Sequence, residues 1–331
     1  FLGVMMTSNK IITNRNKILE VVKQDGAALE YASDSLKADR EVVLEAVKQD
    51  GNALEYASDS LKADREVVLE AVKNLGQKLW HERRYDAFEY ASDSLKADRE
   101  VVLEVVKLDG DTLQEVSKEL QNDKDIVMAA VKNSGNALEY ASKNLKNDKE
   151  VVLAAVADNP VACQYASEEL KADKGFVLEL VRNSGGALRD VSEELKNNKE
   201  VVLVAVTNDG FAVWDVSEEL KNSKEIVLVA VSKDGRVLER VVDVFKNDKE
   251  VVLAAVKTHG YALQEVSKEL QNDKDIVMAA VKHSGNALEY ASKNLKNDKE
   301  VVLEAVKSDE RAMVFASKNL KSDKDIKSVI S

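Results

Sequence analysis

The chain is built from a repeat of 25 residues, and this periodicity limits its fold more than any other feature. One representative copy spans residues 148–172 and reads DKEVVLAAVADNPVACQYASEELKA. The copies begin at residues 14, 39, 64, 98, 123, 148, 173, 198, 223, 248, 273 and 298, and a truncated copy begins at residue 323. Such a sequence predicts an array in which each copy stacks on the next.

The apolar pattern in the first half of a copy predicts a helix rather than a strand. In the copy that begins at residue 39, the pairs Val42 with Ala46 and Val43 with Val47 recur at four-residue spacing. This spacing is typical of one face of a helix, whereas a strand would place Glu45 on the same face as Val43 and Val47.

The second half of each copy predicts another short helix. In the copy that begins at residue 39, Leu54, Ala57 and Leu61 form an apolar stripe. Helices of about ten residues do not persist alone in water, so stacking on neighbours must stabilise them. We therefore predict an all-α fold: an α-solenoid of about twelve helix-turn-helix repeats that runs through residues 1–331 as a single array.

A glycine separates the two predicted helices in most copies. Ten of the 13 glycines take this place, namely Gly26, Gly51, Gly76, Gly110, Gly135, Gly185, Gly210, Gly235, Gly260 and Gly285. Glycine just after a helix is typical of a residue in the left-handed backbone region, so we expect positive φ angles here. The only proline, Pro160, takes the same place in one copy and can also end a helix.

The central position of the second predicted helix covaries with the residue after it. An aromatic residue is followed by Ala and a charged residue by Val in all 12 copies. The central residues are Tyr31, Tyr56, Tyr90, Glu115, Tyr140, Tyr165, Asp190, Asp215, Arg240, Glu265, Tyr290 and Phe315. We interpret the two pairings as two ways to fill one space, with the tyrosines in the core or half-buried. A row of rings for ligand stacking is the alternative.

The second residue of every copy is basic, as in Arg40, Lys149 and Lys249. Acidic residues flank these cations, as Asp148 and Glu150 flank Lys149. We expect a surface ladder of ion pairs that contributes little per pair, and a phosphate-binding track is the alternative.

Charge and cysteine usage exclude several classes of protein. The formal net charge is -12, which repels nucleic acid and anionic membranes. No apolar run approaches the roughly 18 residues of a membrane helix, so we expect neither nucleic-acid binding nor membrane insertion. The single cysteine, Cys163, replaces a stripe leucine and is expected to be buried, with a reactive thiol as the alternative. One cysteine forms no internal disulfide, which favours a reducing intracellular compartment, either cytoplasm or organelle.

Both ends of the chain carry partial copies. Residues 4–11 match residues 138–145 in character, so the chain opens inside a repeat and we expect it to be a piece of a longer protein. In the truncated copy, Lys327 and Ser328 stand where other copies carry Leu and either Glu or Ala, a pattern compatible with a polar cap on the stack.

The clearest departure from the repeat is an insertion of nine residues, 77–85, between the two predicted helices of the copy that begins at residue 64. Insertions in solenoids often lie on the binding face, and Trp and Arg are common anchors of interfaces. We predict Trp80, Arg83, Arg84 and Tyr85 as partner-binding residues. A longer helix end packed on the solenoid is the alternative.

A second departure follows the glycine, where the residue type varies widely. The position is large in three successive copies, at Phe211, Arg236 and Tyr261, and Trp214 stands where Glu or Gln is common. We predict that Phe211, Trp214, Arg236 and Tyr261 line one partner-binding patch. A locally repacked core is the alternative.

The sequence contains no recognisable catalytic, cofactor-binding or metal-binding motif. The three histidines, His81, His259 and His283, lack partners at metal-ligand spacing, although the last two could approach each other from adjacent copies. The carboxylates recur as caps and helix faces, with no unique pair in an apolar setting. We therefore expect no enzyme activity, no cofactor, no metal and no small-molecule substrate.

The sequence resembles a family of tandem repeats known only as a domain of unknown function. The resemblance rests on the core D-[KR]-[ED]-[VI]-V-[LM]-x-A-V-K, then Gly, then A-L-x-Y-A-S-x-x-L, as in residues 39–63 and 298–322, and it extends from residue 14 to the end. Its members occur as arrays in protists, algae and some intracellular bacteria, and two 25-residue copies correspond to one family domain. The resemblance implies an all-helical repeat fold and no known activity, and the loop at residues 77–85 departs from the pattern.

These features together favour a non-catalytic scaffold or protein-interaction platform whose exposed edge of helix-to-helix turns binds partner proteins. The stretches 113–153 and 263–303 are identical except for Asn133 and His283. Such copying suits an extended surface, and it equally suits a structural spacer in a large assembly. A targeting or regulatory arm of a longer enzyme or effector is a further alternative.

Overall fold

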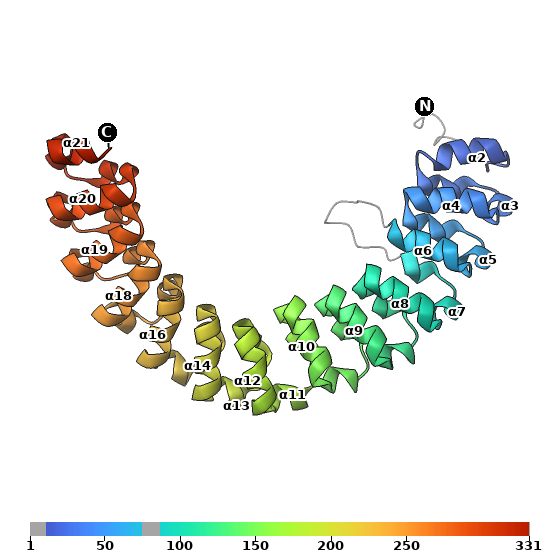
Figure 1. Cartoon of the computed structure of the whole chain (residues 1–331), viewed down its shortest axis with the longest axis horizontal. Coiled ribbons are helices and arrows are strands. Elements are labelled where there is room, and N and C mark those ends of the chain that lie inside the picture. Colours follow the sequence, from blue (N-terminus) through green and yellow to red (C-terminus); the bar gives the residue numbers. More distant parts are fainter. Residues whose placement is uncertain (1–10, 75–86, 331) are drawn as a thin grey trace. The chain divides into compact units, whose positions relative to one another are not determined.

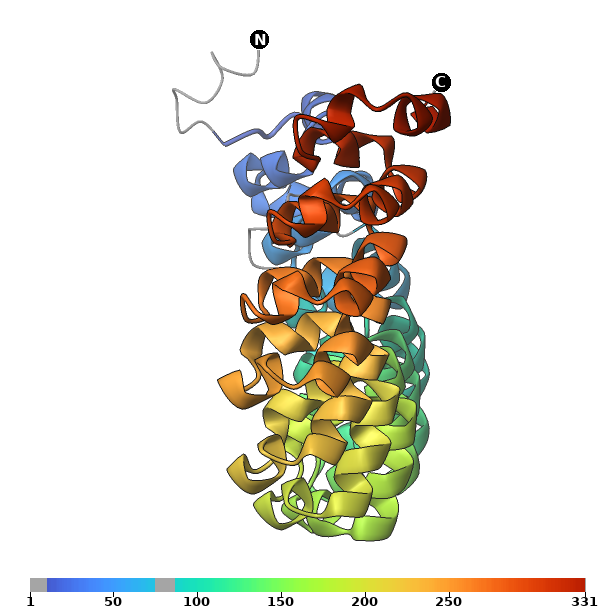
Figure 2. The ribbon, with the colours of Figure 1, turned by 90° about the vertical axis from the view of Figure 1, so that its left-hand side faces the viewer.

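The computed structural model describes residues 11–74 and 87–330. The chain forms two compact units, which we call unit 1 and unit 2, with the division between Ser167 and Glu168. Each unit is a stack of 25-residue copies, seen from two directions in Figures 1 and 2. The described elements are all helical, apart from one isolated bridge between Ile12 and Ala32, so the predicted all-α repeat fold is confirmed.

The first element of each copy is an α-helix, and these helices pack side by side within each unit. In unit 1 they are α2 (Arg15–Val22), α4 (Arg40–Gln49), α6 (Arg65–Lys73), α8 (Arg99–Leu108), α9 (Lys124–Asn133) and α10 (Lys149–Asp158). In unit 2 they are α12 (Lys174–Asn183), α14 (Lys199–Asn208), α16 (Lys224–Lys233), α18 (Lys249–Thr258), α19 (Lys274–His283), α20 (Lys299–Ser308) and α21 (Lys324–Ile330).

The second element is a short 3₁₀ helix, and neighbouring 3₁₀ helices form a row along each unit, which we call the 3₁₀ row. In unit 1 they are η1 (Gly26–Tyr31), η2 (Gly51–Tyr56), η3 (Ala87–Tyr90), η4 (Gly110–Glu115), η6 (Gly135–Tyr140) and η8 (Pro160–Tyr165). In unit 2 they are η9 (Gly185–Asp190), η10 (Gly210–Asp215), η11 (Gly235–Arg240), η12 (Gly260–Gln264), η14 (Gly285–Tyr290) and η16 (Glu310–Phe315).

The third element is a single helical turn that leads to the next copy. In unit 1 these turns are α3 (Asp34–Lys37), α5 (Asp59–Lys62), α7 (Asp93–Lys96), η5 (Leu120–Asn122) and η7 (Leu145–Asn147). In unit 2 they are α11 (Glu168–Ala172), α13 (Glu193–Lys196), α15 (Glu218–Lys221), α17 (Asp243–Lys246), η13 (Leu270–Asn272), η15 (Leu295–Asn297) and η17 (Leu320–Ser322).

The α-helices follow the predicted pattern closely. At the start of α4, the side chain of Asp39 accepts hydrogen bonds from the amides of Glu41 and Val42, as an N-cap residue should. Val42, Ala46 and Val47 are buried in the stack. The helices are therefore held by a polar cap at one end and by apolar packing against neighbouring copies.

The second half of the copy differs from the predicted continuous helix. After η2, the backbone becomes extended at Ala57 (ψ 155°), and the amide of Ser58 donates to the carbonyl of Lys37 in the preceding copy at 2.9 Å. The helix cannot continue because this amide is committed to a neighbour, so tertiary bonding overrides helix propensity. The predicted apolar stripe is nevertheless buried, with Leu54 and Ala57 from one element and Leu61 from the next.

The glycines lie where the sequence places them, but the predicted reason was wrong. Among the described residues no glycine has a positive φ angle. A Cβ atom at Gly135 would lie 2.3 Å from the carbonyl oxygen of Ala155 in the next copy, and the nine described glycines of this position all give such distances, from 2.1 to 2.7 Å. The glycine is needed because the backbones of two copies touch there, and no side chain fits between them.

A ladder of hydrogen bonds joins the copies on the side of the single turns. In the copy that begins at residue 123, the amide of Ser142 donates to the carbonyl of Gln121 at 2.9 Å, and its hydroxyl donates to Asn122 Oδ1. The same backbone bond recurs at other copies, for example from Ser217 to Lys196 at 3.1 Å. We call these contacts the serine ladder.

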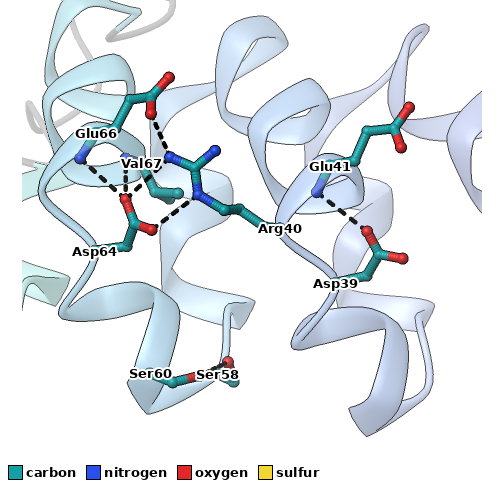
Figure 3. A network of polar contacts seen from close by, with 8 residues as sticks. All are labelled: Asp39, Arg40, Glu41, Ser58, Ser60, Asp64, Glu66 and Val67. Atoms are coloured by element: carbon teal, nitrogen blue, oxygen red, sulfur yellow. Dashed lines mark hydrogen bonds and ion pairs between the residues drawn. The ribbon is translucent and has the colours of Figure 1, made fainter.

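The predicted ladder of ion pairs is also confirmed, and it connects neighbouring copies. Figure 3 shows Arg40 between two acidic residues of the next copy: its Nε donates to Asp64 at 2.9 Å, and its guanidinium also bonds to Glu66. These bonds raise the pKa of Arg40, and the Asp64 hydrogen bond is the largest cause. The alternative of a free phosphate track is disfavoured because such cations already have carboxylate partners.

The 3₁₀ row presents its central residues partly to solvent. Tyr56, Tyr140 and Tyr290 are half-buried, while the Ala after each of them is buried. The predicted half-buried setting is thus confirmed for these tyrosines, whereas Tyr31 in the first copy is 39% exposed. Cys163 is buried as predicted.

Candidate functional site

Two of the residues predicted to bind a partner meet on η10 in unit 2. Phe211 is the second residue of this 3₁₀ helix and Trp214 the fifth, and their ring centroids lie 4.8 Å apart at an interplanar angle of 51°. The side chain of Asp209 caps the element by accepting the amide of Phe211 at 2.9 Å. The tight 3₁₀ turn brings residues three apart onto the same side, so both rings lie on one surface.

Two arginines from η11 cover these rings. The guanidinium of Arg236 lies 5.0 Å from the centroid of Phe211, and that of Arg240 lies 4.3 Å from the centroid of Trp214, both within cation–π range. We call Phe211, Trp214, Arg236 and Arg240 the Arg-aromatic cluster. The sequence predicted three of its four members.

The two arginines differ in their ion pairs. Arg236 donates from Nε and Nη2 to the carboxylate of Asp234 and keeps the pKa of that carboxyl below its ordinary value. Arg240 is exposed and makes no ion pair with any residue that the structure describes. The cluster therefore holds one neutralised cation and one cation that is available to a ligand.

The indole nitrogen of Trp214 also lacks a partner. Its Nε1 atom is buried, and no acceptor for its hydrogen lies among the described residues. A buried donor without an acceptor costs on the order of 1–3 kcal/mol, so Trp214 is not explained by stability alone.

A hollow of about 290 Å³ opens beside the cluster and is bordered by η9, η10 and η11. Gly186 borders it, and Arg189 and Asp215 on its wall form an ion pair at 3.5 Å. Asp190 directly follows Arg189 in the sequence, and burial raises the pKa of its carboxyl group. The hollow thus joins an aromatic wall to charged groups of both signs.

A larger hollow of about 620 Å³ lies beside α6 in unit 1, but both of its arginines are already paired. Arg40 on its wall bonds to Asp64, and Arg65 lies 3.4 Å from Glu100. These residues belong to the ladder of ion pairs.

The remaining predicted site residues lie elsewhere. Tyr261 is 38% exposed and contacts His259 (centroids 5.9 Å apart) and Tyr290 (6.3 Å) rather than the Arg-aromatic cluster. Trp80, Arg83, Arg84 and Tyr85 lie outside the described residues. The predicted single patch is therefore two groups within unit 2, and the loop residues stay a prediction.

Sequence reasoning missed Arg240 as a site residue. The signal was present, because Arg240 is the only basic residue at the central position of the 3₁₀ row in the 12 copies. The sequence did not indicate how far one copy is shifted relative to the next. This shift places Arg240 of η11 over the Trp214 ring of η10.

His259 and His283 come from adjacent copies, as expected. His283 takes part in the polar contacts between these two copies. His283 Nδ1 accepts the amide of Gly260 at 3.2 Å, and burial lowers the pKa of His259. No group of three or more His, Cys, Asp or Glu side chains in the described segments is arranged to hold a metal ion. Within the same segments, no helix has the length and apolar character that crossing a membrane requires.

The fold and its repeated contacts define a helical-repeat protein with a stacked architecture. The sequence matches the family described as Domain of unknown function (DUF4116), and the chain belongs to this family. The matched segments are residues 14–62, 39–96, 64–121, 98–146, 123–171, 173–221, 206–246, 223–271, 248–296 and 298–327. No curated protein matches the sequence.

Proposed function

We propose that this chain is a non-catalytic scaffold that binds partner proteins along the 3₁₀ row. The observation that carries the proposal is the Arg-aromatic cluster. Trp and Arg are the side chains that most often dominate binding energy at interfaces, particularly around a pocket that excludes water. In this chain they replace the small or polar residues of other copies at the corresponding positions, such as Asn136 and Glu139.

The absence of catalysis is part of the same proposal. Carboxylates with a lowered pKa, such as Asp64 and Asp123, are helix caps that bond to an arginine of the preceding copy, and the motif recurs along the array. A repeated structural role is a sufficient cause for such shifts. The net charge of -12 supports protein rather than nucleic acid as the partner.

A pull-down from lysate of the source organism, read by mass spectrometry, tests the proposal. The baits are the intact chain and a variant with Phe211→Asn and Trp214→Glu, the residues found at these positions in the copies that begin at residues 123 and 273. The matched control carries Asn136→Ala and Glu139→Ala at the same positions of another copy. We expect some proteins to be retained by both the intact chain and the control but not by the cluster variant. Equal retention by all baits would contradict a role for the cluster.

A fourth bait lacking residues 77–85 tests the predicted anchors Trp80, Arg83, Arg84 and Tyr85. Partners lost only from this bait would place the principal site on the insertion. Partners lost from neither variant would favour the spacer function, for which the near-identical stretches 113–153 and 263–303 provide support, since they lengthen the array without adding a unique site.

A further inference from the structure

The copy that spans residues 223–247 carries apolar side chains on the serine-ladder side, where all other copies are polar. Val242 replaces a serine that the other 11 copies share, and Val244 replaces Ser, Asn or Glu. The two valines are 44% and 67% exposed, whereas Phe245 beside them is buried. Two exposed valines, separated in sequence by Asp243, thus place apolar side chains on a turn that is polar in the other copies, and nothing in the fold requires them.

The same copy has lost its hydrogen bonds to both neighbours on this side. Among the described residues, the amide of Val242 does not bond to Lys221, and the amide of Ser267 does not bond to Lys246. The next bonds of the serine ladder on either side, from Ser217 to Lys196 (3.1 Å) and from Ser292 to Gln271 (2.9 Å), are intact.

The copy also lacks two contacts on its other faces. Ser223 replaces the usual capping Asp and makes no side-chain bond to the helix it precedes. The amide of Gly210 has no partner in the copy, although Gly185 and Gly285 bond to the equivalent residues of theirs. Each loss weakens the stack, and substitutions that break local rules without a structural gain are characteristic of functional sites.

The apolar surface is continuous in sequence with the Arg-aromatic cluster. Val242 follows Arg240 by two residues. Arg240 lies over Trp214, and its guanidinium pairs with no carboxylate among residues 11–74 and 87–330. One copy thus offers an apolar pair and an unpaired guanidinium side by side along the chain. We call Arg240, Val242 and Val244 the Val-Arg surface.

We propose that the Val-Arg surface binds a short extended peptide of a partner protein in which an acidic residue lies next to an apolar one. This inference rests on the proposed function and names its ligand. The apolar side chain packs on the valines, and the carboxylate bonds to the guanidinium of Arg240, which can bind both of its oxygens.

Two other ligands fit less well. A cationic peptide would have to displace Arg236 and Arg240 from the ring faces that they already cover. A phosphorylated peptide is usually bound by a cluster of arginines, and here Arg236 is already neutralised by Asp234.

Selection from a random 12-residue peptide library on phage tests the inference, with the intact chain as target. The comparison target carries Arg240→Tyr, Val241→Ala, Val242→Ser and Val244→Asn, which are the residues of the copy that begins at residue 273 and keep the pairing of an aromatic with Ala, so they should preserve the fold. The control target carries Ser292→Ala and Asn294→Ala in that other copy. Enriched peptides are synthesised, and their affinities for all three proteins are measured by fluorescence anisotropy.

We expect the enriched peptides to contain Asp or Glu next to Leu, Ile, Val or Phe. The comparison target should bind them at least tenfold more weakly than the intact chain does, and the control target should bind them with the same affinity as the intact chain. Changing the acidic residue of such a peptide to its amide should weaken binding about tenfold, because the amide cannot pair with Arg240. Added salt should weaken the binding of the acidic peptide but not the binding of the peptide in which the acidic residue is replaced by its amide.

The other outcomes separate this inference from the proposed function. Surface-dependent peptides that are basic or uncharged would overturn the acidic ligand but leave the scaffold proposal intact. Peptides lost with Phe211→Asn and Trp214→Glu but retained by the comparison target would move the site to the hollow. If no peptide depends on the Val-Arg surface, the inference is wrong, and the pull-down alone decides the proposed function.

Discussion

The stretch 263–303 and the copy at residues 223–247 lie in the same unit and share one core, but they differ in their polar contacts. In the latter, Ile226, Val227, Ala230 and Val231 are buried completely, as are their counterparts in the stretch 263–303, Ile276, Val277, Ala280 and Val281. The stretch 263–303 keeps its helix caps and the serine-ladder bond from Ser292 to Gln271, and only its Ser267, which faces the copy 223–247, lacks the equivalent bond within the described part of the chain. The copy 223–247 lacks the equivalent bonds, and it carries the unpaired arginine and the exposed valines. Apolar stacking, together with the ion pair of Lys224 with Asp248, is thus sufficient to hold this copy in the array, and its helix cap and serine-ladder bonds can be lost.

The largest effect is expected where the comparison depends on backbone contact. Gly135→Ala places a Cβ 2.3 Å from a carbonyl oxygen of the next copy, and we expect a loss of about 3 kcal/mol in the free energy of unfolding. Gly210→Ala, at the joint with the copy 223–247, should cost less because its distance is 2.7 Å. Urea unfolding followed by circular dichroism measures both. Gly186→Ala is the control, since its nearest neighbour is a side-chain oxygen at 3.7 Å; equal stability of all three variants would rule out close approach as the reason for glycine.

A capping substitution should restore one missing contact of the copy 223–247. Ser223→Asp supplies a carboxylate to the free amides of α16, and we expect a gain of about 1 kcal/mol at neutral pH. In the next copy, a hydrogen bond from Lys224 is the main cause of the lowered pKa of Asp248. An aspartate whose folded pKa lies below its unfolded value stabilises the protein above the unfolded pKa and ceases to do so as the pH falls through the folded pKa. The gain should therefore be complete well above pH 4 and should decline as the pH falls below about 4.

Thermal unfolding at pH 7 and pH 3 measures this effect. Asp273→Ser, the reverse change in a regular copy, is the matched variant and should lose less stability at pH 3 than at pH 7. A gain from Ser223→Asp that is undiminished at pH 3 would assign it to something other than the ionised cap.

Rebuilding one rung of the serine ladder should have a smaller effect. Val242→Ser should gain about 0.5–1 kcal/mol by restoring a hydroxyl donor, and Ser142→Val should lose a similar amount, because its hydroxyl bonds to Asn122. Hydrogen exchange at the turn that follows each residue reads the effect locally. Faster exchange in Val242→Ser would show that the serine hydroxyl does not hold the ladder together.

The smallest effect is expected at the one difference between the near-identical stretches. Asn133 accepts the amide of Gly110 (2.8 Å) and donates to the carbonyl of Lys107 (3.0 Å), whereas His283 accepts only the amide of Gly260 (3.2 Å) from the preceding copy. His283→Asn should therefore stabilise the protein by about 0.5 kcal/mol, and Asn133→His should destabilise it by about as much. Urea midpoints of the two variants should move in opposite directions; a shared direction would mean that the second hydrogen bond does not contribute.

The sequence specified the repeat boundaries, the α-helices and their buried residues, because the period, the caps and the apolar spacing are all local signals. Gly135 shows the limit of this reasoning. Its position was evident, but its cause is a carbonyl oxygen of Ala155, 20 residues further along the chain, which only the stacking of copies brings close. The break at Ala57 was missed for the same reason, since the amide of Ser58 bonds to the preceding copy.

The candidate site was predictable to the same extent. Phe211 and Trp214 lie on one 3₁₀ helix, so their proximity followed from unusual residues at close spacing. Arg240 and Tyr261 required knowledge of which neighbour each side chain faces. That depends on the offset between copies, and sequence periodicity does not report it.

The contact between glycine and alanine also determines how the array can change in length. Each contact joins one copy to the next, so inserting or removing a whole number of copies leaves every such junction with both of its partners. The two copies without the glycine carry Pro160 and Glu310, and the copies after them carry Leu180 and Ile330 in place of the alanine. At these two junctions both partners change together, whereas Gly76 is followed by Val105 in the next copy, after the nine-residue insertion. Duplication in units of 25 residues is the growth that keeps glycine and alanine paired.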